Sequence, residues 1–226
     1  MPAPLSVVIP SLNAAQELPG CLIALMEGLE AGLIRDLVLS DGGSEDATVA
    51  LAEEAGAKIV HGAASRGGQL RRGCAVAKGE WLLVLHADTR LAPGWSVAVQ
   101  QHLQEGQGIP AYFTLRFRAS GLAPRLVAGW ANLRSRLFGL PYGDQGLLIR
   151  RQTYEAAGGY PDQPLMEDVA LVRRLKRLKP LPAMARTGAD RYLRDGWLRR
   201  GGGNLWTLAR YLCGADPARL ARTYQK

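Results

Sequence analysis

Short apolar runs, each followed by a polar loop, recur along the first half of the chain. The runs are Leu5–Pro10, Leu37–Ser40, Lys58–Val60 and Trp81–Leu85. The first three lead through their loops into helical patterns. Apolar strands that alternate with helices are typical of a parallel sheet covered by helices on both faces. The sequence therefore predicts an α/β fold with a mostly parallel sheet.

The pattern changes beyond residue 109. The segments that follow are a strand over 109–118, an amphipathic segment over 122–138, an apolar run over 146–149, and helical patterns over 166–178 and 204–212. Because helical patterns dominate this part, we expect a helical C-terminal extension over 191–226. The 226 residues are 47% hydrophobic, which suffices for one compact core. The prediction is a single domain over 1–226.

Cysteine usage and the length of the apolar runs indicate where the chain works. Cys21, Cys74 and Cys213 are widely spaced and odd in number, which argues against a disulfide framework and a thiolate metal site. No stretch approaches the roughly 18 uncharged residues of a membrane span, and the first residues do not resemble a secretory signal. We expect a protein of the reducing cytoplasm, either free or at the inner face of the membrane.

Charge is distributed unevenly along the chain. Residues 1–115 contain 7 Lys and Arg against 12 Asp and Glu, whereas residues 116–226 contain 21 against 8. The basic half either forms a solvated helical surface or faces an anionic partner. One prediction is weak contact with an anionic membrane through Trp206, Tyr211 and the leucine stripe of 204–212. Nucleic acid is not an expected partner, because no binding module is recognised.

Three polar segments follow predicted strands, at the edge where open α/β sheets bind ligands. They contain Pro10, Ser11 and Asn13, then Asp41 and Gly42, then His86, Ala87 and Asp88. Because parallel strands end at the same edge, we expect one shared crevice. Asp88 is suited to Mn²⁺ or Mg²⁺, with the phosphates of a ligand completing the coordination shell. The alternatives are a helix-capping role for Asp88 and an ordinary turn at Asp41.

A glycine-rich, basic segment precedes the third predicted helix. Its candidate phosphate-binding residues are Arg66, Gly67, Gln69 and Arg71. Backbone amides at a helix N-terminus favour phosphate, and guanidinium groups add charge. The segment does not match the G-x-x-x-x-G-K-[ST] loop. No G-x-G-x-x-G follows the first strand either, which disfavours a nicotinamide-dependent dehydrogenase.

Two acidic sites occur in the second half. Asp144 lies in a tight polar loop before an apolar run, and Glu167 and Asp168 open a helical pattern. Acids in a first helical turn are commonly partners of the helix dipole. The functional alternative is a general base that deprotonates a hydroxyl group.

In their order along the chain, these segments resemble the inverting glycosyltransferases of family 2, over roughly the first 180 residues. Val8–Asn13 resembles the opening strand and loop of that family, and Glu17 stands at the position of its usual acid. The resemblance implies the A-type, Rossmann-like glycosyltransferase fold. It also implies a nucleotide-sugar-binding half over 1–115 and an acceptor-side half over 116–190.

The resemblance assigns roles to the acids. Asp41 would contact the nucleotide base, and Asp88 would bind the metal as the second acid of a D-x-D motif. Asp144 would lie in the acceptor-side loop. Glu167 and Asp168 would form the acidic pair whose second member serves as catalytic base.

Two departures from the family pattern narrow the implied function. His86 stands at the first acid of the D-x-D motif, so only Asp88 carries over as a metal ligand, and His86 is a candidate for sugar or phosphate contact. The Q-x-x-R-W segment of processive members is reduced to Trp197-Leu198-Arg199-Arg200, which favours transfer of a single sugar. The H-A-D-T and S-R-G-x-Q segments are similar to a bacterial subgroup with members linked to arsenosugar biosynthesis.

The implied reaction is transfer of one sugar, a hexose above all, from a nucleotide-diphosphate donor to an acceptor hydroxyl. Inversion, assistance by Mn²⁺ or Mg²⁺, and a UDP-sugar donor are expected. The sequence identifies no acceptor and leaves a homodimer open. The first alternative is a nucleotidyltransferase, although no basic glycine-rich loop follows the first strand. The second is an inactive nucleotide-binding protein that docks on a membrane.

Overall fold

One sheet runs through the part of the chain that the computed structural model describes, residues 3–105 and 108–224. Its strands are β1 (Leu5–Ser11), β2 (Ile34–Asp41), β3 (Lys58–His61), β4 (Trp81–Val84), β5 (Arg90–Leu91), β6 (Ala111–Phe117), β7 (Leu147–Arg150) and β8 (Lys179–Thr187). Their order in the sheet is β3-β2-β1-β4-β7-β6-β8-β5. The first four are parallel, as predicted, whereas β7 is antiparallel to both β4 and β6.

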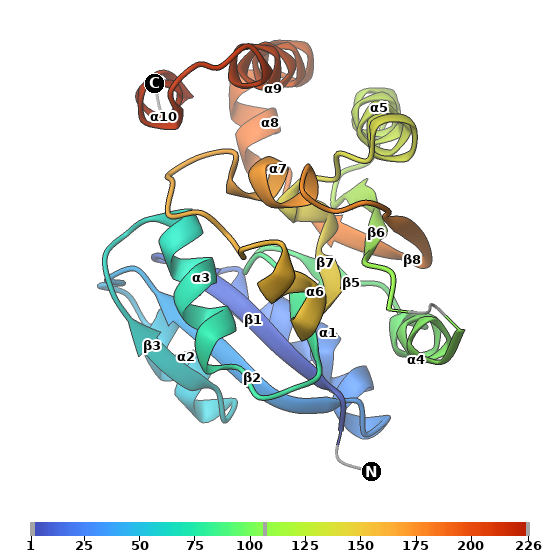
Figure 1. Cartoon of the computed structure of the whole chain (residues 1–226). Coiled ribbons are helices and arrows are strands. Elements are labelled where there is room, and N and C mark those ends of the chain that lie inside the picture. The colour runs from blue at the N-terminus through green and yellow to red at the C-terminus, as the bar shows by residue number, and fades with distance from the viewer. Residues whose placement is uncertain (1–2, 106–107, 225–226) are drawn as a thin grey trace.

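Helices cover both faces of this sheet (Figure 1). They are α1 (Leu18–Glu30), α2 (Thr48–Glu54), α3 (Arg66–Val76), α4 (Trp95–Glu105), α5 (Leu122–Phe138), α6 (Arg151–Ala156), α7 (Glu167–Val172), α8 (Asp190–Asp195), α9 (Trp197–Leu212) and α10 (Pro217–Tyr224), with a short 3-10 helix η1 (Gly143–Gln145). Side chains alternate along β1, so Val7 and Ile9 pack in the core cluster that α1 and α4 cover, while Val8 packs in the cluster under α3. Burial on both faces explains the continuous apolar runs.

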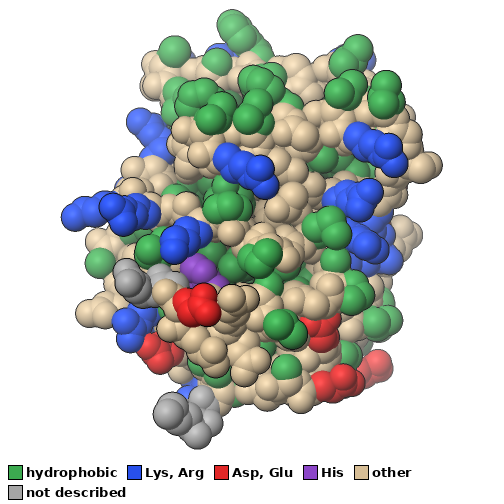
Figure 2. All heavy atoms as spheres, turned by 90° about the vertical axis from the view of Figure 1, so that its right-hand side faces the viewer, with side chains coloured by type: hydrophobic (Ala, Val, Ile, Leu, Met, Phe, Trp, Pro, Cys, Tyr) green, Lys and Arg blue, Asp and Glu red, His purple; other side chains and the backbone are tan. Residues whose placement is uncertain are grey.

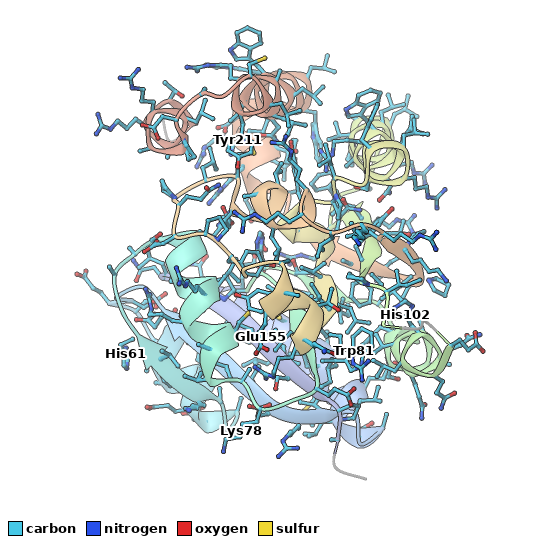
Figure 3. The ribbon with its side chains drawn as sticks, in the orientation of Figure 1. His61, Lys78, Trp81, His102, Glu155 and Tyr211 are labelled. Atoms are coloured by element: carbon cyan, nitrogen blue, oxygen red, sulfur yellow. The ribbon has the colours of Figure 1, made fainter. Side chains whose placement is uncertain are left out.

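Helices α5, α8, α9 and α10 gather at one end of the molecule, opposite the N-terminus (Figure 1). Leu208 of α9 is buried in a cluster with Val169 of α7 and Leu220 of α10. Tyr211 packs on the same cluster and lies on the inner side of α9 (Figure 3). Leu208 and Tyr211 are thus used inside the protein, whereas Leu205, Trp206 and Leu212 are exposed, and the membrane contact stays a prediction. No helix of the described residues is long and apolar enough to cross a membrane.

The second half differs from the prediction in three places. The helix predicted over 166–178 ends at Val172, and the chain then enters β8, which was not predicted. Pro180 and Pro182 are unsuited to a helix interior, and β8 instead pairs in parallel with β6. Helix α9 begins at Trp197, before the predicted 204, because tertiary packing overrides the low helix propensity of the glycines at 201–203.

Candidate active site

The loops after β1 and β2 are tied together by hydrogen bonds. Asn13 donates its backbone N–H to Ser44 Oγ (2.9 Å) and accepts the Glu45 N–H at Oδ1 (2.9 Å). The Ala15 N–H donates to Asp46 Oδ2 (3.0 Å). Asn13 adopts a left-handed φ of 49°, which asparagine tolerates better than most residues. The structure therefore brings the first two predicted loops together.

Asp41 organises the second of these loops. Its Oδ2 accepts the backbone N–H groups of Gly43 (2.8 Å) and Ser44 (2.9 Å), and Oδ1 accepts Ser44 Oγ–H (2.5 Å). Burial alone would raise the pKa of Asp41, but the hydrogen bonds from Ser44 and Gly43 lower it below its ordinary value. Asp41 is 1% exposed, so the turn role is the one present here. Contact with a nucleotide base stays a prediction.

Gln69 is buried between the ends of β1 and β2. Its Nε2 donates to the carbonyl oxygens of Ser11 (2.6 Å) and Ser40 (3.1 Å). Pro10 pairs with Ser40 across the same strand ends. A Cβ on Gly42 would lie 3.0 Å from Gln69 Nε2, so glycine permits this close approach. Gln69 thus clamps the two strand ends with its amide N–H groups, and its predicted phosphate contact stays a prediction.

The N-terminus of α3 is filled by a later loop of the chain. Gly67 donates its N–H to the Gln163 carbonyl (3.1 Å), and a Cβ on Gly67 would lie 2.0 Å from Pro161 O. Asp162 Oδ1 accepts Ser65 Oγ–H (2.5 Å). An acid of the protein therefore lies where the helix dipole favours an anion. The Gly67 amide thus has a partner within the protein, and its predicted phosphate contact stays a prediction.

The two arginines predicted to bind phosphate have different neighbours. Arg66 Nε lies 3.7 Å from Glu167 Oε1. Arg71 is exposed, and its charge opposes the rise that burial causes in the pKa of the Tyr154 hydroxyl. Arg66 thus reaches the acceptor-side acids, whereas Arg71 faces Tyr154.

Glu167 combines burial with an unpaired oxygen. It is 1% exposed, and its Oε2 is among the buried atoms without a hydrogen-bond partner in the described part of the chain. Burial and the charge of Asp168 raise the pKa of Glu167 to about 7, although Arg66 opposes the rise. Met166, just before it, has a left-handed φ of 62°. Backbone strain and perturbed carboxyl groups of this kind cluster at functional sites.

Asp168 connects α7 to η1. Its Oδ2 accepts the Gly143 N–H (2.7 Å), and Oδ1 accepts the Val169 N–H (2.7 Å). A Cβ on Gly143 would lie 2.4 Å from His86 Nε2, so glycine lets the imidazole approach this loop. Burial and the charge of Arg66 lower the pKa of His86 to about 3, against the opposing effect of Asp168. His86 is therefore neutral at pH 7.

Asp144 shares this electrostatic environment. Its Oδ1 is buried and has no hydrogen-bond partner among the described residues. Burial raises the pKa of Asp144 to about 6; Arg134 opposes the rise, and the charges of Asp168 and Asp88 add to it. Three acids from separate loops thus lie close enough to influence one another.

Asp88 follows β4 and lies beside the end of β8. Its Oδ2 accepts Thr187 Oγ–H at 3.4 Å. The described residues contain no cluster of three or more His, Cys, Asp or Glu side chains that could hold an ion. Mg²⁺-type sites commonly use one or two carboxylates and substrate phosphates, and the unpaired Oδ1 of Asp144 near Asp88 fits that pattern. Ala87 packs into the core, so its side chain is not available to a ligand.

Arg118 is a site residue that the sequence interpretation missed. Its Nη2 lies 2.5 Å from Glu17 Oε2, and Arg90 Nη2 lies 3.3 Å from the same oxygen. A Cβ on Gly188 would lie 3.2 Å from Arg118 Nη2 and 3.4 Å from Asp88 Oδ2, so Arg118 and Asp88 are neighbours. Arg118 directly follows β6. The strand-end rule that selected the earlier loops would have found it.

The acceptor-side residues close around a small cavity. His86, Gly143, Glu167 and Asp168 contribute to its lining, and its volume is about 10 Å³. That volume suits roughly one water molecule.

The fold and the acids at its strand ends define a class of protein, the A-type glycosyltransferases. A family model described as Glycosyl transferase family 2 matches residues 6–139. The chain belongs to glycosyl transferase family 2.

Curated relatives match a limited stretch of the chain. A PGL/p-HBAD biosynthesis glycosyltransferase of Mycobacterium bovis is 38% identical over 99 residues, which cover 40% of this chain and 38% of the relative. A TPR repeat-containing protein of Synechococcus elongatus is 37% identical over 81 residues, or 35% of this chain and 19% of that protein. The chain thus spans less than half the length of these relatives.

Solved structures share the fold over most of the chain. Glucosyl-3-phosphoglycerate synthase from Mycobacterium tuberculosis, in complex with Mn²⁺, UDP and phosphoglyceric acid, is 21% identical with a TM-score of 0.59, covering 94% of this chain and 79% of that one. S. aureus TarS, in complex with UDP, is 12% identical with a TM-score of 0.61, covering 98% and 70%. At these identities the likeness shows the fold. The link to arsenosugar biosynthesis stays a prediction.

Proposed function

We propose that this chain transfers one hexose from a UDP-sugar to an acceptor hydroxyl with inversion at the anomeric carbon. The observation that carries the proposal is the closeness of Asp88, after β4, to Asp144 in η1 and Asp168 in α7, whose charges both act on Asp144, in a family 2 chain. The complexes of the M. tuberculosis synthase with UDP and Mn²⁺ support the choice of donor and cation.

Asp168 is the proposed general base. Two backbone N–H groups fix its carboxylate, which is partly exposed, so its remaining lone pairs have a defined direction. It would take the proton of the acceptor hydroxyl while that oxygen bonds to the anomeric carbon and the bond from this carbon to the diphosphate breaks. A single displacement of this kind inverts the configuration. Glu167 is less suited, because it is buried and its Oε1 lies 3.7 Å from Arg66 Nε.

Asp88 is the proposed protein ligand of the divalent cation, with Asp144 beside it. When bound, the cation would neutralise charge on the departing diphosphate. Arg66 and Arg118 add fixed positive charge at the rim, and Glu17 holds Arg118 in position. The clamp of Gln69 keeps the ends of β1 and β2 in register beneath the donor.

The test is turnover of nucleotide sugars. UDP-, GDP-, dTDP- and CDP-linked hexoses are ranked by thermal shift with Mn²⁺ and with Mg²⁺, and nucleotide release is then measured with the best donor. Binding at 100 times the dissociation constant adds about 2.7 kcal/mol of stability, which is enough for ranking. UDP binding without turnover of any donor, across a panel of acceptor alcohols, would favour the inactive nucleotide-binding alternative. The small volume of the cavity beside Asp168, about 10 Å³, favours that alternative.

The proposed location is the cytoplasm. Cys21, Cys74 and Cys213 are free thiols, and the first two are buried, which suits a reducing compartment. Fractionation of cells that express the full chain tests this location.

A further inference from the structure

Helix α5 carries its large apolar side chains on the solvent side. Leu122, Leu126, Trp130, Leu133 and Leu137 are all exposed, by 45% to 74%. Their spacing of three and four residues puts them on one face of the helix. A surface helix of a globular protein normally turns such a face toward the core.

The inner face of α5 is already occupied by smaller residues. Ala128 and Ala131 pack against Leu115 and Phe117 of β6. The side chain of Asn132 accepts the Leu115 N–H (2.8 Å) and donates to the Leu115 carbonyl (3.1 Å). The helix is therefore fixed in this orientation, and its outer leucines have no role in the core.

Helix α9 continues the apolar surface. Leu198 and Trp206 are 87% and 67% exposed. A Cβ on Gly201 of α9 would lie 3.8 Å from Val127 Cγ2 of α5, so the two helices are neighbours. Figure 2 shows hydrophobic side chains gathered at this end of the molecule. We call the exposed apolar residues of α5 and α9 named above the docking face.

The two helices of the docking face, α5 and α9, and the neighbouring α10 carry basic side chains and no acidic ones. Exposed arginines come from three of the four helices at this end: Arg125 and Arg136 from α5, Arg199 from α9, and Arg219 and Arg222 from α10. The fourth, α8, contains Asp190 and Asp195, and Asp195 pairs with Arg194 and Arg200. Leucine and tryptophan beside arginine form the pattern of helices that lie in a membrane interface.

We propose that the docking face binds the surface of an anionic lipid bilayer. A second copy of this chain would bring arginines against arginines, with no acid on these helices to pair with them. Anionic headgroups supply the missing charge, and the acyl boundary accepts the leucines and tryptophans. Because Leu208 of α9 packs with Val169 of α7, docking holds α7 close to the bilayer. The inference does not depend on the proposed reaction.

Vesicle co-sedimentation of the full chain tests the proposal. We expect recovery with phosphatidylcholine vesicles that contain phosphatidylglycerol, and recovery that falls as salt rises. Leu126→Ser combined with Trp130→Ser should lower the partition coefficient about tenfold or more. The matched control is Ile23→Ser with Leu29→Ser on α1, where the side chains are 71% and 53% exposed. This control should bind as the parent does.

Further measurements distinguish an anionic bilayer from a second copy of the chain as the partner of the docking face. Arg125→Gln with Arg136→Gln should weaken binding to anionic vesicles about fivefold or more and flatten its salt dependence. Circular dichroism checks that each variant is folded. Equal recovery with neutral and anionic vesicles overturns the proposal, as does equal loss in the α1 control. A dimer in analytical ultracentrifugation that Leu126→Ser with Trp130→Ser abolishes would overturn it in favour of a second copy.

Discussion

The acids of the proposed donor side and those of the proposed acceptor side lie in opposite environments. On the donor side, the carboxylate of Asp41 accepts three hydrogen bonds from its own loop, which lower its pKa. On the acceptor side, Asp144 and Glu167 each keep a buried oxygen without a partner, and burial raises the pKa of both. The donor side is thus built for stability. The proposed acceptor side keeps buried polar atoms without partners, which lowers the stability of the fold and is typical of reactive sites.

The largest expected effect concerns the base. Asp168→Asn should keep donor affinity and lower kcat by roughly 10²–10⁴, because it removes proton abstraction and preserves volume. Calorimetric titration with UDP and steady-state nucleotide release measure the two quantities separately. Asp162→Asn is a control, since Asp162 bonds Ser65 at the N-terminus of α3. Near-normal turnover of Asp168→Asn would falsify the assignment and move attention to Asp144 or Glu167.

The second prediction concerns the cation. Asp88→Asn should remove the additional thermal stabilisation that Mn²⁺ gives to the donor-bound protein. For scale, a donor at 100 times its dissociation constant adds about 2.7 kcal/mol in all. UDP binding without metal should persist, since the loops of Asn13 and Asp41 are unchanged. An Asp88→Asn protein whose donor affinity still rises with Mn²⁺ contradicts the metal assignment.

The third prediction compares one substitution in two regions. Gly67→Ala should lower the free energy of unfolding by about 1–3 kcal/mol, because its Cβ would lie 2.0 Å from Pro161 O and no flexible side chain can yield there. Gly202→Ala in α9 meets no atom within 4 Å and should raise stability by roughly 0.5–1 kcal/mol. Urea unfolding measures both. Equal effects of the two substitutions on the free energy of unfolding would mean that the loop of 161–163 does not pack against the start of α3.

The sequence predicts the donor side well and the acceptor side in part. The periodicity of β1 to β4 and the loops behind them are local signals, and all are present in the structure. Asp162, which occupies the start of α3, comes from a loop 97 residues after Ser65, so no local pattern could reveal it. Periodicity also identifies α5 as a helix, but it does not say which face of the helix turns outward. The face that packs against β6 carries the small residues Ala128 and Ala131, so the large leucines do not mark the buried face.

The last prediction is a pH dependence of opposite sign in the two regions. The folded pKa of Asp41 lies below its unfolded value, so its contribution to stability is complete above about pH 4 and is lost as pH falls through the folded pKa. The pKa of Glu167 in the folded protein is raised to about 7. Above about pH 4.3 the folded protein therefore binds more protons than the unfolded chain, and its stability falls as pH rises toward 7. The difference in unfolding free energy between the parent and Glu167→Gln should therefore change between pH 4.5 and 7, roughly the interval between the two pKa values. The difference between the parent and Asp41→Asn should change only below about pH 4. Urea unfolding across this pH range measures both differences in unfolding free energy. If the Glu167→Gln difference stays constant with pH, the carboxyl group of Glu167 is not held buried and unpaired, and the contrast between Asp41 and Glu167 fails.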